Sequence, residues 1–403
     1  MEYIREISKD VYWVGANDRR LALFENIFPI PRGVSYNSYL ITDEKTVLLD
    51  TVDFSVSRQF MENLAAVLGE RPLDYLVVNH MEPDHGSTIE ELVRIYPGLK
   101  IICNAKAAQM MKQFFTFDID SRVEIVKEGD TFSCGTHQLT FVMAPMVHWP
   151  EVMMTYEIQS KILFCADAFG TFGALEGGLF NDEFDFERDW LDDARRYYAN
   201  IVGKYGAQVQ AALKKTAGLD ISMLCSLHGP VWRTNLDYIL GKYDLWSRYE
   251  PEENGVVIVY ASMYGNTESA VNALAGKIAE KGVQPIAVHN VSGVNVSYII
   301  SDMFKYSHIV IASPTYNGRI YPLVEAVMTD AKALNVQNRS VCVIENGSWA
   351  PGAGKQIREI LESMKNMTIL ADTLTIKSTL KKEDAGILDI LAGRIADSME
   401  QAQ

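Results

Sequence analysis

The sequence lacks several patterns that would assign it to familiar classes of redox protein. It contains only five cysteines in 403 residues, and no two of them form a C-x-x-C pair. This spacing encodes neither a disulfide framework nor a cysteine-ligated iron–sulfur or rubredoxin-type site. We therefore expect the cysteines to be small buried thiols in a reducing compartment. No G-x-G-x-x-G follows a strand-like run, so a nicotinamide site is not indicated.

Positive charge and long apolar runs are also scarce. Lysine and arginine together number 37 against 52 aspartates and glutamates, which gives a formal net charge of -15. Nucleic acids and acidic lipids are bound by basic surfaces, so neither is an expected partner. No stretch reaches the ~18 uninterrupted apolar residues of a membrane span, and the first residues lack the apolar core of a signal peptide. These absences predict a cytoplasmic protein.

The length and one polar stretch predict two domains. A chain of 403 residues, of which 48% are apolar, is too long for one ordinary core. Residues 247–255 are polar and contain Pro251 and Gly255, as linkers commonly do. We therefore expect one domain at residues 1–249 and a second at residues 250–403.

The first region mixes short strand-like runs with helical ones, and polar residues follow its strands. Leu73–Asn79 is typical of a buried strand and is followed at once by His80. Ser87–Tyr96 has helical spacing and stops before a proline–glycine pair. Such a mixed α/β region usually holds its ligand sites on loops at strand ends.

The second region alternates strand-like and helix-like runs five times. The strand-like runs cover residues 256–261, 283–289, 309–312, 341–345 and 368–376. The helix-like runs cover residues 267–281, 298–305, 323–334, 354–364 and 385–396. This alternation predicts a doubly wound parallel sheet whose ligand site lies at the carboxyl ends of the strands.

Four potential metal ligands fall within six residues of the first region, directly after a strand. They are His80, Glu82, Asp84 and His85. Pro83 between them favours an irregular loop over a helix, which would let the side chains spread around a metal cluster. Burying two carboxylates together is costly unless positive charge is near, and metal ions supply that charge.

Three more ligand-type residues follow apolar strand-like runs further along the chain. They are His148, Asp167 and His228. The remaining histidines have no comparable setting, and we expect structural or surface roles for His137, His289 and His308.

The order of these ligands resembles that of the metallo-β-lactamase superfamily, whose usual loop is H-x-H-x-D-H and usually binds zinc. Here Glu82 replaces the second histidine, and the resulting H-x-E-x-D-H loop resembles that of the flavodiiron proteins, which bind two irons. Two ferrous ions bring four positive charges, which three carboxylates and a bridging hydroxide would balance. Oxygen and nitrogen donors without thiolate also suit iron that changes its oxidation state better than structural zinc.

This resemblance assigns the ligands to two irons. One iron would take His80, Glu82 and His148, the other would take Asp84, His85 and His228, and Asp167 would bridge them. Each iron would keep an open position for a small ligand.

Three loops that follow strands of the second region resemble the FMN-binding loops of flavodoxins. The first opens a helix and offers backbone N–H groups and hydroxyls to a phosphate, although Tyr264 stands where flavodoxins usually have Thr or Ser. The other two each carry an aromatic residue that would flank the flavin ring. The candidate residues are Ser262, Met263, Tyr264, Gly265, Asn266 and Thr267, then Ser313, Pro314, Thr315, Tyr316, Asn317 and Gly318, then Asn346, Gly347, Ser348, Trp349 and Ala350.

The resemblance covers nearly the whole chain and implies both fold and activity. The implied fold is an αββα metallo-β-lactamase-type sandwich followed by a five-stranded, doubly wound flavodoxin-like domain. The implied activity is that of an oxidoreductase that passes electrons through FMN to the diiron site and reduces O2 to water, NO to nitrous oxide, or both, as detoxification in an anaerobe. A separate donor, rubredoxin or a reduced deazaflavin, would supply the electrons. Family members form head-to-tail homodimers or dimers of such dimers.

Two residues near the expected pocket carry weaker signals. Tyr197 resembles a family tyrosine that points toward the diiron pocket and would hydrogen-bond the bound substrate. A tyrosine packed in the core fits the same residues equally well. Glu25 stands where some relatives have a histidine, a departure that would alter substrate preference.

Two other functions stay open on the sequence alone. One is a zinc-dependent hydrolase with an attached flavodoxin domain, against which Glu82 argues. The other is an electron carrier that uses FMN alone, against which the complete set of seven ligands argues. The sequence does not rank NO against O2, because pocket polarity and proton supply set that preference.

Overall fold

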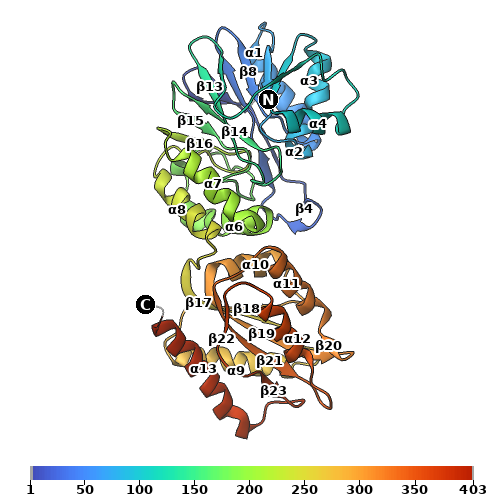
Figure 1. Cartoon of the computed structure of the whole chain (residues 1–403), viewed down its shortest axis with the longest axis vertical. Coiled ribbons are helices and arrows are strands. Elements are labelled where there is room, and N and C mark those ends of the chain that lie inside the picture. Colours follow the sequence, from blue (N-terminus) through green and yellow to red (C-terminus); the bar gives the residue numbers. More distant parts are fainter. Residues whose placement is uncertain (1–2, 402–403) are drawn as a thin grey trace. The chain divides into compact units, whose positions relative to one another are not determined.

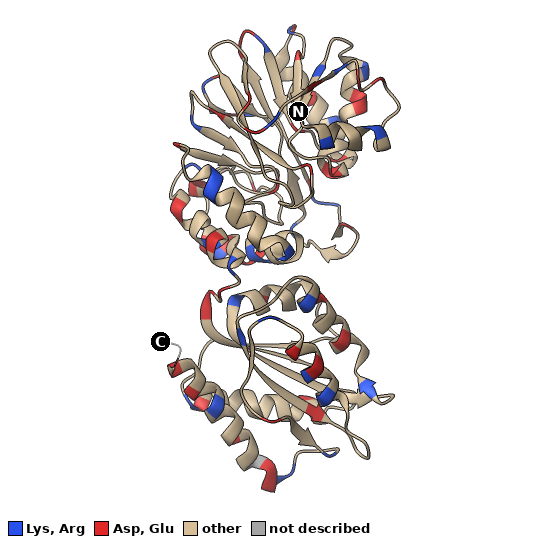
Figure 2. Ribbon diagram, viewed as in Figure 1, with Lys and Arg blue, Asp and Glu red and all other residues tan. Residues whose placement is uncertain are grey.

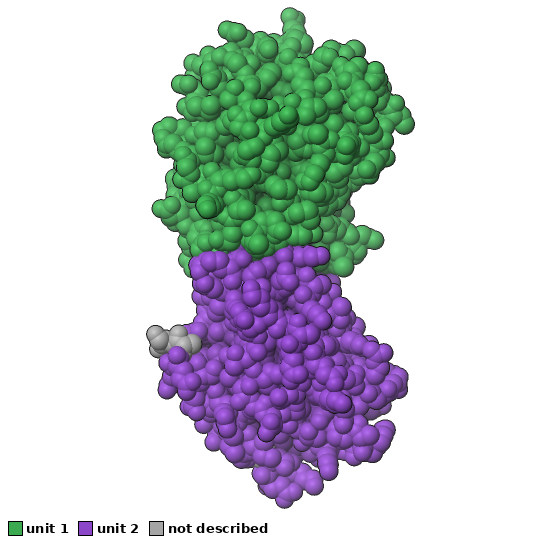
Figure 3. All heavy atoms as spheres, viewed as in Figure 1, with its two compact units in different colours: residues 1–198, 205–244 green, residues 199–204, 245–403 purple. Residues whose placement is uncertain are grey.

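The computed structural model describes residues 3–401, which divide into two compact units (Figure 3). Residues up to Tyr198 form the first unit together with Tyr205–Asp244, and Ala199–Lys204 form the second with the residues from Leu245 onward. Basic residues are interspersed with acidic ones along both units (Figure 2). None of the helices in residues 3–401 is long and apolar enough to cross a membrane.

The first unit contains two large sheets, drawn in the upper part of Figure 1. The larger has the strand order β1 (Arg5–Ser8), β2 (Val11–Trp13), β7 (Tyr39–Thr42), β8 (Thr46–Leu49), β9 (Tyr75–Val77), β10 (Lys100–Cys103) and β11 (Val123–Ile125). The smaller has the order β12 (Thr131–Ser133), β13 (Gln138–Met143), β14 (Met153–Glu157), β15 (Ile162–Phe164) and β16 (Met223–Cys225). Two short ribbons pair β3 (Ala16–Asp18) with β6 (Val34–Tyr36), and β4 (Leu23–Phe24) with β5 (Phe28–Pro29).

Helices cover these sheets and complete the expected αββα sandwich. Between strands β8 and β11 of the larger sheet, the chain forms α1 (Ser57–Leu68), α2 (Pro83–Gly86), α3 (Ile89–Ile95) and α4 (Ala105–Phe114). After β15 come α5 (Phe186–Asp189), α6 (Leu191–Tyr197), α7 (Gly206–Thr216) and, following β16, α8 (Leu236–Ser247). Helix α4 packs on β11 and α7 on β13, one helix against each sheet. All five cysteines are buried, as predicted.

Parallel pairing decides where the polar loops of this unit emerge. Strands β8, β9 and β10 are parallel neighbours, and so are β15 and β16. The carboxyl ends of parallel strands lie at the same edge of a sheet, so the loops that follow them lie together there. Strands β8, β15 and β16 are buried throughout, which fixes their register and therefore the positions of those loops.

The second unit is the doubly wound parallel sheet that the sequence predicts. Its strand order is β18 (Ile286–Asn290), β17 (Glu253–Tyr260), β19 (Tyr306–Tyr316), β21 (Arg339–Asn346) and β22 (Met367–Ile369), with β20 (Arg319–Ile320) and β23 (Leu374–Ile376) beside them. The helices are α9 (Asn266–Glu280), α10 (Val296–Lys305), α11 (Pro322–Ala333), α12 (Ala353–Glu362) and α13 (Ala385–Glu400). Helices α9 and α13 pack together over one face, and α10, α11 and α12 lie over the other (Figure 1).

The last strand of this sheet departs from the prediction of one continuous run over residues 368–376. Val341 of β21 pairs with Ile369, whereas Ile344 pairs with Leu374, so a three-residue step on β21 faces a five-residue step on its neighbour. The extra residues leave the ladder, and the Ala371 carbonyl accepts a hydrogen bond from the Arg358 guanidinium. The strand therefore divides into β22 and β23 around a bulge.

Candidate metal centre and flavin site

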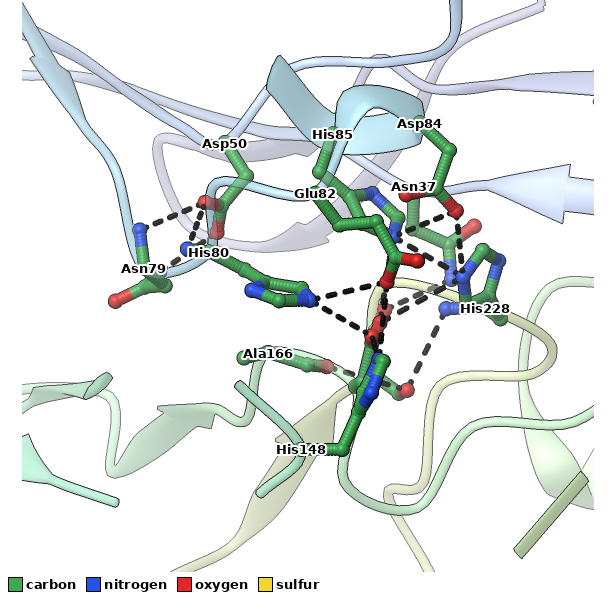
Figure 4. Close-up of polar contacts among 12 residues, drawn as sticks. Asn37, Asp50, Asn79, His80, Glu82, Asp84, His85, His148, Ala166 and His228 are labelled. Carbon is green, nitrogen blue, oxygen red and sulfur yellow. Dashed lines mark hydrogen bonds and ion pairs between the residues drawn. The ribbon is translucent and has the colours of Figure 1, made fainter. Parts of the chain in front are cut away.

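The seven predicted metal ligands lie together, on four loops of the first unit (Figure 4). Four of them follow β9, one lies on the connection between β13 and β14, one follows β15 and one follows β16. All are nearly inaccessible to solvent, and the most exposed of them, Asp84, is 9% exposed. Side chains that are far apart in sequence thus converge on one place from loops of both sheets.

The loop after β9 is anchored by Asp50, the residue that follows β8. Its Oδ1 accepts hydrogen bonds from the backbone N–H groups of Asn79 (2.7 Å) and His80 (3.2 Å), and its Oδ2 accepts one from the Asn79 side-chain amide (2.7 Å). Asp50 has a left-handed backbone, with a φ of 53°. Burial raises the pKa of Asp50 to about 6, although these donors favour the charged form. Asp50 therefore fixes the start of the ligand loop.

The prediction that Pro83 keeps this loop irregular is wrong. Pro83–Gly86 forms one helical turn, α2, with Pro83 at its first position. Proline is favoured there, because the first N–H groups of a helix have no partner within it and the ring presets φ. The turn is closed by the His85 N–H, which donates to the Glu82 carbonyl at 2.9 Å.

The first of two ligand groups consists of His80, Glu82 and His148 around one oxygen of Asp167. The Nε2 atoms of His80 and His148 lie 3.2 and 3.1 Å from Asp167 Oδ2. The same nitrogens lie 3.2 and 2.9 Å from Glu82 Oε2. Four donor atoms thus surround a single point.

The second group consists of Asp84, His85 and His228. The Nε2 atoms of His85 and His228 lie 3.2 and 3.3 Å from Asp84 Oδ2. They lie 3.3 and 3.6 Å from Asp167 Oδ1, the oxygen that faces away from the first group. Asp167 therefore presents one carboxylate oxygen to each group, which is the arrangement of a bridging ligand.

The spacing of these donors fits metal ions. Bonds of 2.0–2.2 Å to nitrogen and oxygen hold two donors on one ion roughly 2.8–3.6 Å apart. The Nε2 atoms of His85 and His228 lie 3.0 Å apart. Because His228 Nδ1 donates to the Ser35 carbonyl at 2.7 Å, its Nε2 holds a lone pair when the ring is neutral. Both oxygens of Asp84 are buried without a hydrogen-bond partner among the described residues, and a cation between these atoms would satisfy them all.

Charge in this cluster is concentrated and shifts the pKa of its members strongly. Burial alone would lower the pKa of His85, but Asp84 and Asp167 raise it to about 10. Burial likewise opposes protonation of His148, yet Asp167 and Glu82 raise its pKa to about 9. Despite burial, His80 and His85 hold the pKa of Asp167 well below its usual range. Protons thus compensate the carboxylates here, and metal ions would displace those protons on binding.

Two buried residues that contact the cluster were not predicted from the sequence. Glu151 Oε1 accepts hydrogen bonds from His80 Nδ1 (2.7 Å) and from the Met81 N–H (2.9 Å). The Ser35 carbonyl plays the corresponding part for His228. An acid beside Pro150, at the end of the loop that carries His148, was the one signal that pointed to Glu151.

Tyr197, at the end of α6, lies in the wall of the metal site. Its ring lies 5.5 Å from the His228 ring and 5.2 Å from Phe172, measured between centroids. Its hydroxyl is buried and has no hydrogen-bond partner among the described residues. Burial, together with the charge of Asp167, raises its pKa well above the usual value. Tyr197 is thus a neutral donor that no described residue uses.

Glu25 lies at a tight turn beside the first ligand group. Glu25 and Asn26 have φ angles of 48° and 57°, and the Ile27 N–H donates to the Phe24 carbonyl at 3.0 Å. Glu25 and Asn26 are thus the central residues of a β-turn within the three-residue connection that joins β4 to β5. Although the residue as a whole is exposed, burial around its carboxyl group and the charge of Glu82 raise the pKa of Glu25 to about 8.

A pocket in the second unit lies where three of its strands end, after β17, β19 and β21. It is lined by Ser262, Met263, Tyr264, Asn266, Thr267, Pro314, Thr315, Asn346, Gly347, Ser348, Trp349 and Ser378. Helix α9 begins here at Asn266, after Gly265, whose φ is 87°. The Ser262 hydroxyl accepts from the N–H groups of Gly265 (3.1 Å) and Glu268 (3.3 Å) at this helix start. Backbone N–H groups and a hydroxyl at a helix start suit a phosphate.

Some predicted flavin-site residues do not line this pocket. They are Gly265, Ser313, Tyr316, Asn317, Gly318 and Ala350. Ser313 is fully buried, and its hydroxyl accepts from the Tyr321 N–H at 3.1 Å and donates to the Pro314 carbonyl at 2.9 Å. Its hydroxyl therefore holds the loop rather than facing the pocket.

Ser378, which follows β23, is a pocket residue that the sequence did not indicate. Its hydroxyl donates to Ser348 Oγ at 2.8 Å, and its carbonyl accepts from the Asn346 side chain at 3.1 Å. Tyr264 and Trp349 stand at the pocket with 91% and 92% of their surface exposed. A fourth loop therefore joins the three predicted ones.

Comparisons with known proteins agree with these features. Residues 34–229 match the model of a family described as ODP family beta lactamase. This chain is 34% identical to the anaerobic nitric oxide reductase flavorubredoxin of Aeromonas hydrophila. The alignment covers 359 residues, which are 87% of this chain and 71% of that relative. The structure of rubredoxin oxygen:oxidoreductase from the anaerobe Desulfovibrio gigas superposes with a TM-score of 0.92 at 29% identity, covering 99% of both chains. The flavodiiron protein of Giardia intestinalis has a TM-score of 0.92 at 25% identity, covering 100% of this chain and 98% of that one.

Proposed function

The chain belongs to the flavodiiron protein family, and from that premise we propose that it reduces NO, O2 or both at two irons, with electrons that arrive through FMN. The chain is an oxidoreductase of this family. The observation that carries the proposal is the placement of Asp167, whose two oxygens face two separate groups of histidine and carboxylate donors. Such a placement suits a pair of ions that share one carboxylate.

We assign each ion the side chains that already surround one point. One iron would be held by His80, Glu82 and His148, the other by Asp84, His85 and His228, and Asp167 would be shared between them. When bound, the two irons supply open coordination positions and electrons for a small diatomic molecule. The Tyr197 hydroxyl, buried beside His228, would be free to donate a hydrogen bond to that molecule. The closed surroundings of the cluster keep water from competing for these contacts.

The pocket of the second unit is proposed to hold FMN, which relays single electrons when bound. Its phosphate would be held at the start of α9, where Ser262 and Thr267 line the pocket. Trp349 and Tyr264 would flank the flavin ring, because they are the pocket's exposed aromatic side chains. We accordingly propose residues 1–249 as the metal-binding domain and residues 250–403 as the FMN-binding domain.

Electrons reach FMN from a separate donor in this proposal. One solved relative is named for its rubredoxin substrate, and rubredoxin is the donor we propose first, with a reduced deazaflavin second. The family resemblance also supports a head-to-tail homodimer, or a dimer of dimers, in the cytoplasm of an anaerobe that must remove NO or O2.

The test is metal analysis and stopped-flow kinetics on protein purified without oxygen. We expect about two irons and one FMN per chain, and rapid oxidation of the fully reduced protein by NO, O2 or both. The His85→Ala variant should lose this reaction while its FMN is still reduced. Two zincs in place of iron would replace the proposal with the hydrolase, and turnover that survives His85→Ala would favour the FMN-only carrier.

A further inference from the structure

The two ligand groups differ in the hydrogen-bond partners of the histidine Nδ1 atoms, which face away from the other ligands. His80 of the first group points its Nδ1 at a carboxylate, Glu151 Oε1, at 2.7 Å. In the second group, His228 Nδ1 meets the neutral Ser35 carbonyl, and His85 Nδ1 has no hydrogen-bond partner among the described residues. An imidazole that donates to an anion becomes a stronger electron donor to its metal than one that donates to a neutral carbonyl.

Glu151 is held rigidly in this position. It is 1% exposed, and its Oε1 also accepts from the Met81 N–H. Its backbone carbonyl accepts from the Asn104 side chain, whose own oxygen caps α4 by accepting from Lys106 and Ala107 at 3.0 Å each. Glu151 is therefore tied to α4 through its backbone carbonyl and to the ligand loop through its carboxylate.

The negative charge of Glu151 falls mainly on His80. Its second oxygen, Oε2, is buried without a hydrogen-bond partner among the described residues, and within residues 3–401 the carboxylate forms its ion pair with His80. Asp50 is the other buried acid at this loop, but its oxygens accept from backbone and amide N–H groups rather than from an imidazole nitrogen.

We propose that Glu151, acting through His80, makes the iron held by His80, Glu82 and His148 the harder of the two to reduce. The other iron would then be reduced first, by one electron from FMN. Each such step would add one electron to one ferric ion and break no covalent bond, and the proton between His80 and Glu151 would stay in that hydrogen bond. The inference rests on the proposed function, because it requires that the bound ions be iron.

The physical reason is the charge that the ligand passes on. Glu151 adds negative charge to the side of the first iron, which stabilises the ferric over the ferrous ion. The second iron lacks such a contact through His85 and His228. Glu151 is thus a positioning and tuning residue, and its effect should appear in reduction potentials as well as in rates.

The test is a reductive titration of the iron-loaded, FMN-containing protein and of its E151Q variant, followed by EPR. Glutamine keeps the oxygen that accepts from His80 and removes the charge. We expect the ferric-to-ferrous ratio of the harder iron to fall about tenfold at a given potential, which is a rise of about 59 mV in the lower potential. The higher potential should move far less, so the gap between the two narrows.

The matched control is E157Q. Glu157 is a buried glutamate of the same unit that lies 3.1 Å from the imidazole of His137, a histidine outside the cluster. Its replacement should leave both potentials unchanged. An unchanged gap in E151Q, an equal rise of both potentials, or a wider gap would each overturn the proposal.

Glu151→Asp covers the case in which E151Q does not fold. The shorter side chain withdraws the carboxylate from His80 and should raise the same potential by a smaller amount, and unchanged potentials would again overturn the inference. Metal analysis of the native protein distinguishes a failure of the role of Glu151 from a failure of the proposed function. Two irons with an unaffected gap would overturn only the role of Glu151, whereas two zincs would overturn the proposed function as well.

Discussion

The metal cluster and the flavin pocket are built on different principles. The cluster is made of buried side chains whose functional atoms already surround two points. The pocket is an open end of a parallel sheet, formed by backbone N–H groups, small hydroxyl residues and two exposed aromatic rings. One site is specified by residue type and the other mainly by where the chain turns. Substitutions should therefore act sharply in the first and mildly in the second.

The largest effect is expected from Asp167→Ala, which removes a donor from both ligand groups at once. Iron content should fall well below two per chain, and NO or O2 reduction should drop by more than the roughly ten- to hundredfold typical of residues outside the ligand set. FMN content and flavin reduction should stay normal. His137→Ala, at a buried histidine outside the cluster, is the control, and full iron loading of Asp167→Ala would refute the bridging role.

Without metal, the cluster should make stability depend on pH. The pKa of His85 is raised from 6.5 to about 10 and that of His148 to about 9 in the folded protein. A histidine whose pKa is higher in the folded than in the unfolded protein stabilises the fold. This stabilisation is complete when the pH is below the unfolded-state pKa, and it is lost as the pH rises through the folded-state pKa. The metal-free protein should therefore lose stability between about pH 6.5 and 10, as measured by urea unfolding. Iron-loaded protein should not show this loss, because its histidines are already deprotonated.

Tyr197→Phe tests a single hydroxyl at the metal site. Turnover should fall by roughly two- to tenfold, since one hydrogen bond of about 0.5–1.5 kcal/mol is lost, while iron content stays the same. Tyr39→Phe is the matched control, because the Tyr39 hydroxyl is buried too but donates to the Ser226 carbonyl at 2.7 Å. Equal turnover in Tyr197→Phe and the wild type would leave Tyr197 with a packing role.

Trp349→Ala tests the flavin pocket and should have the smallest effect. Losing one aromatic contact costs about 0.5–1.5 kcal/mol, a roughly two- to tenfold weaker affinity for FMN. Tyr316→Ala serves as the comparison, since Tyr316 was predicted to flank the ring but does not line the pocket. Fluorescence titration of the FMN-free protein would measure both. A larger loss for Tyr316 than for Trp349 would reverse our assignment of the ring-flanking residue.

The two sites also differ in how far the sequence alone could specify them. All seven residues proposed as ligands lie together in the structure. They could be recognised in the sequence because histidine and carboxylate side chains that follow strands are typical metal ligands. Glu151 was missed because an acid after a proline is typical of a surface turn, and only the fold brings it to His80. Ser313 shows the opposite case, since its type suggested a contact with flavin, whereas its hydroxyl forms hydrogen bonds within its own loop. Pro83 was misread because its place at the first position of a helical turn depends on where that turn begins.

The four loops that carry the ligands come from both sheets of the first unit, four ligands from the larger sheet and three from the smaller. Bound ions would therefore act as cross-links between the two halves of the sandwich. Anything that binds only the folded state stabilises it by mass action. The amount of folded protein in a cell would then follow the iron supply, and an iron-starved cell would lose this protein to proteolysis as well as losing its activity.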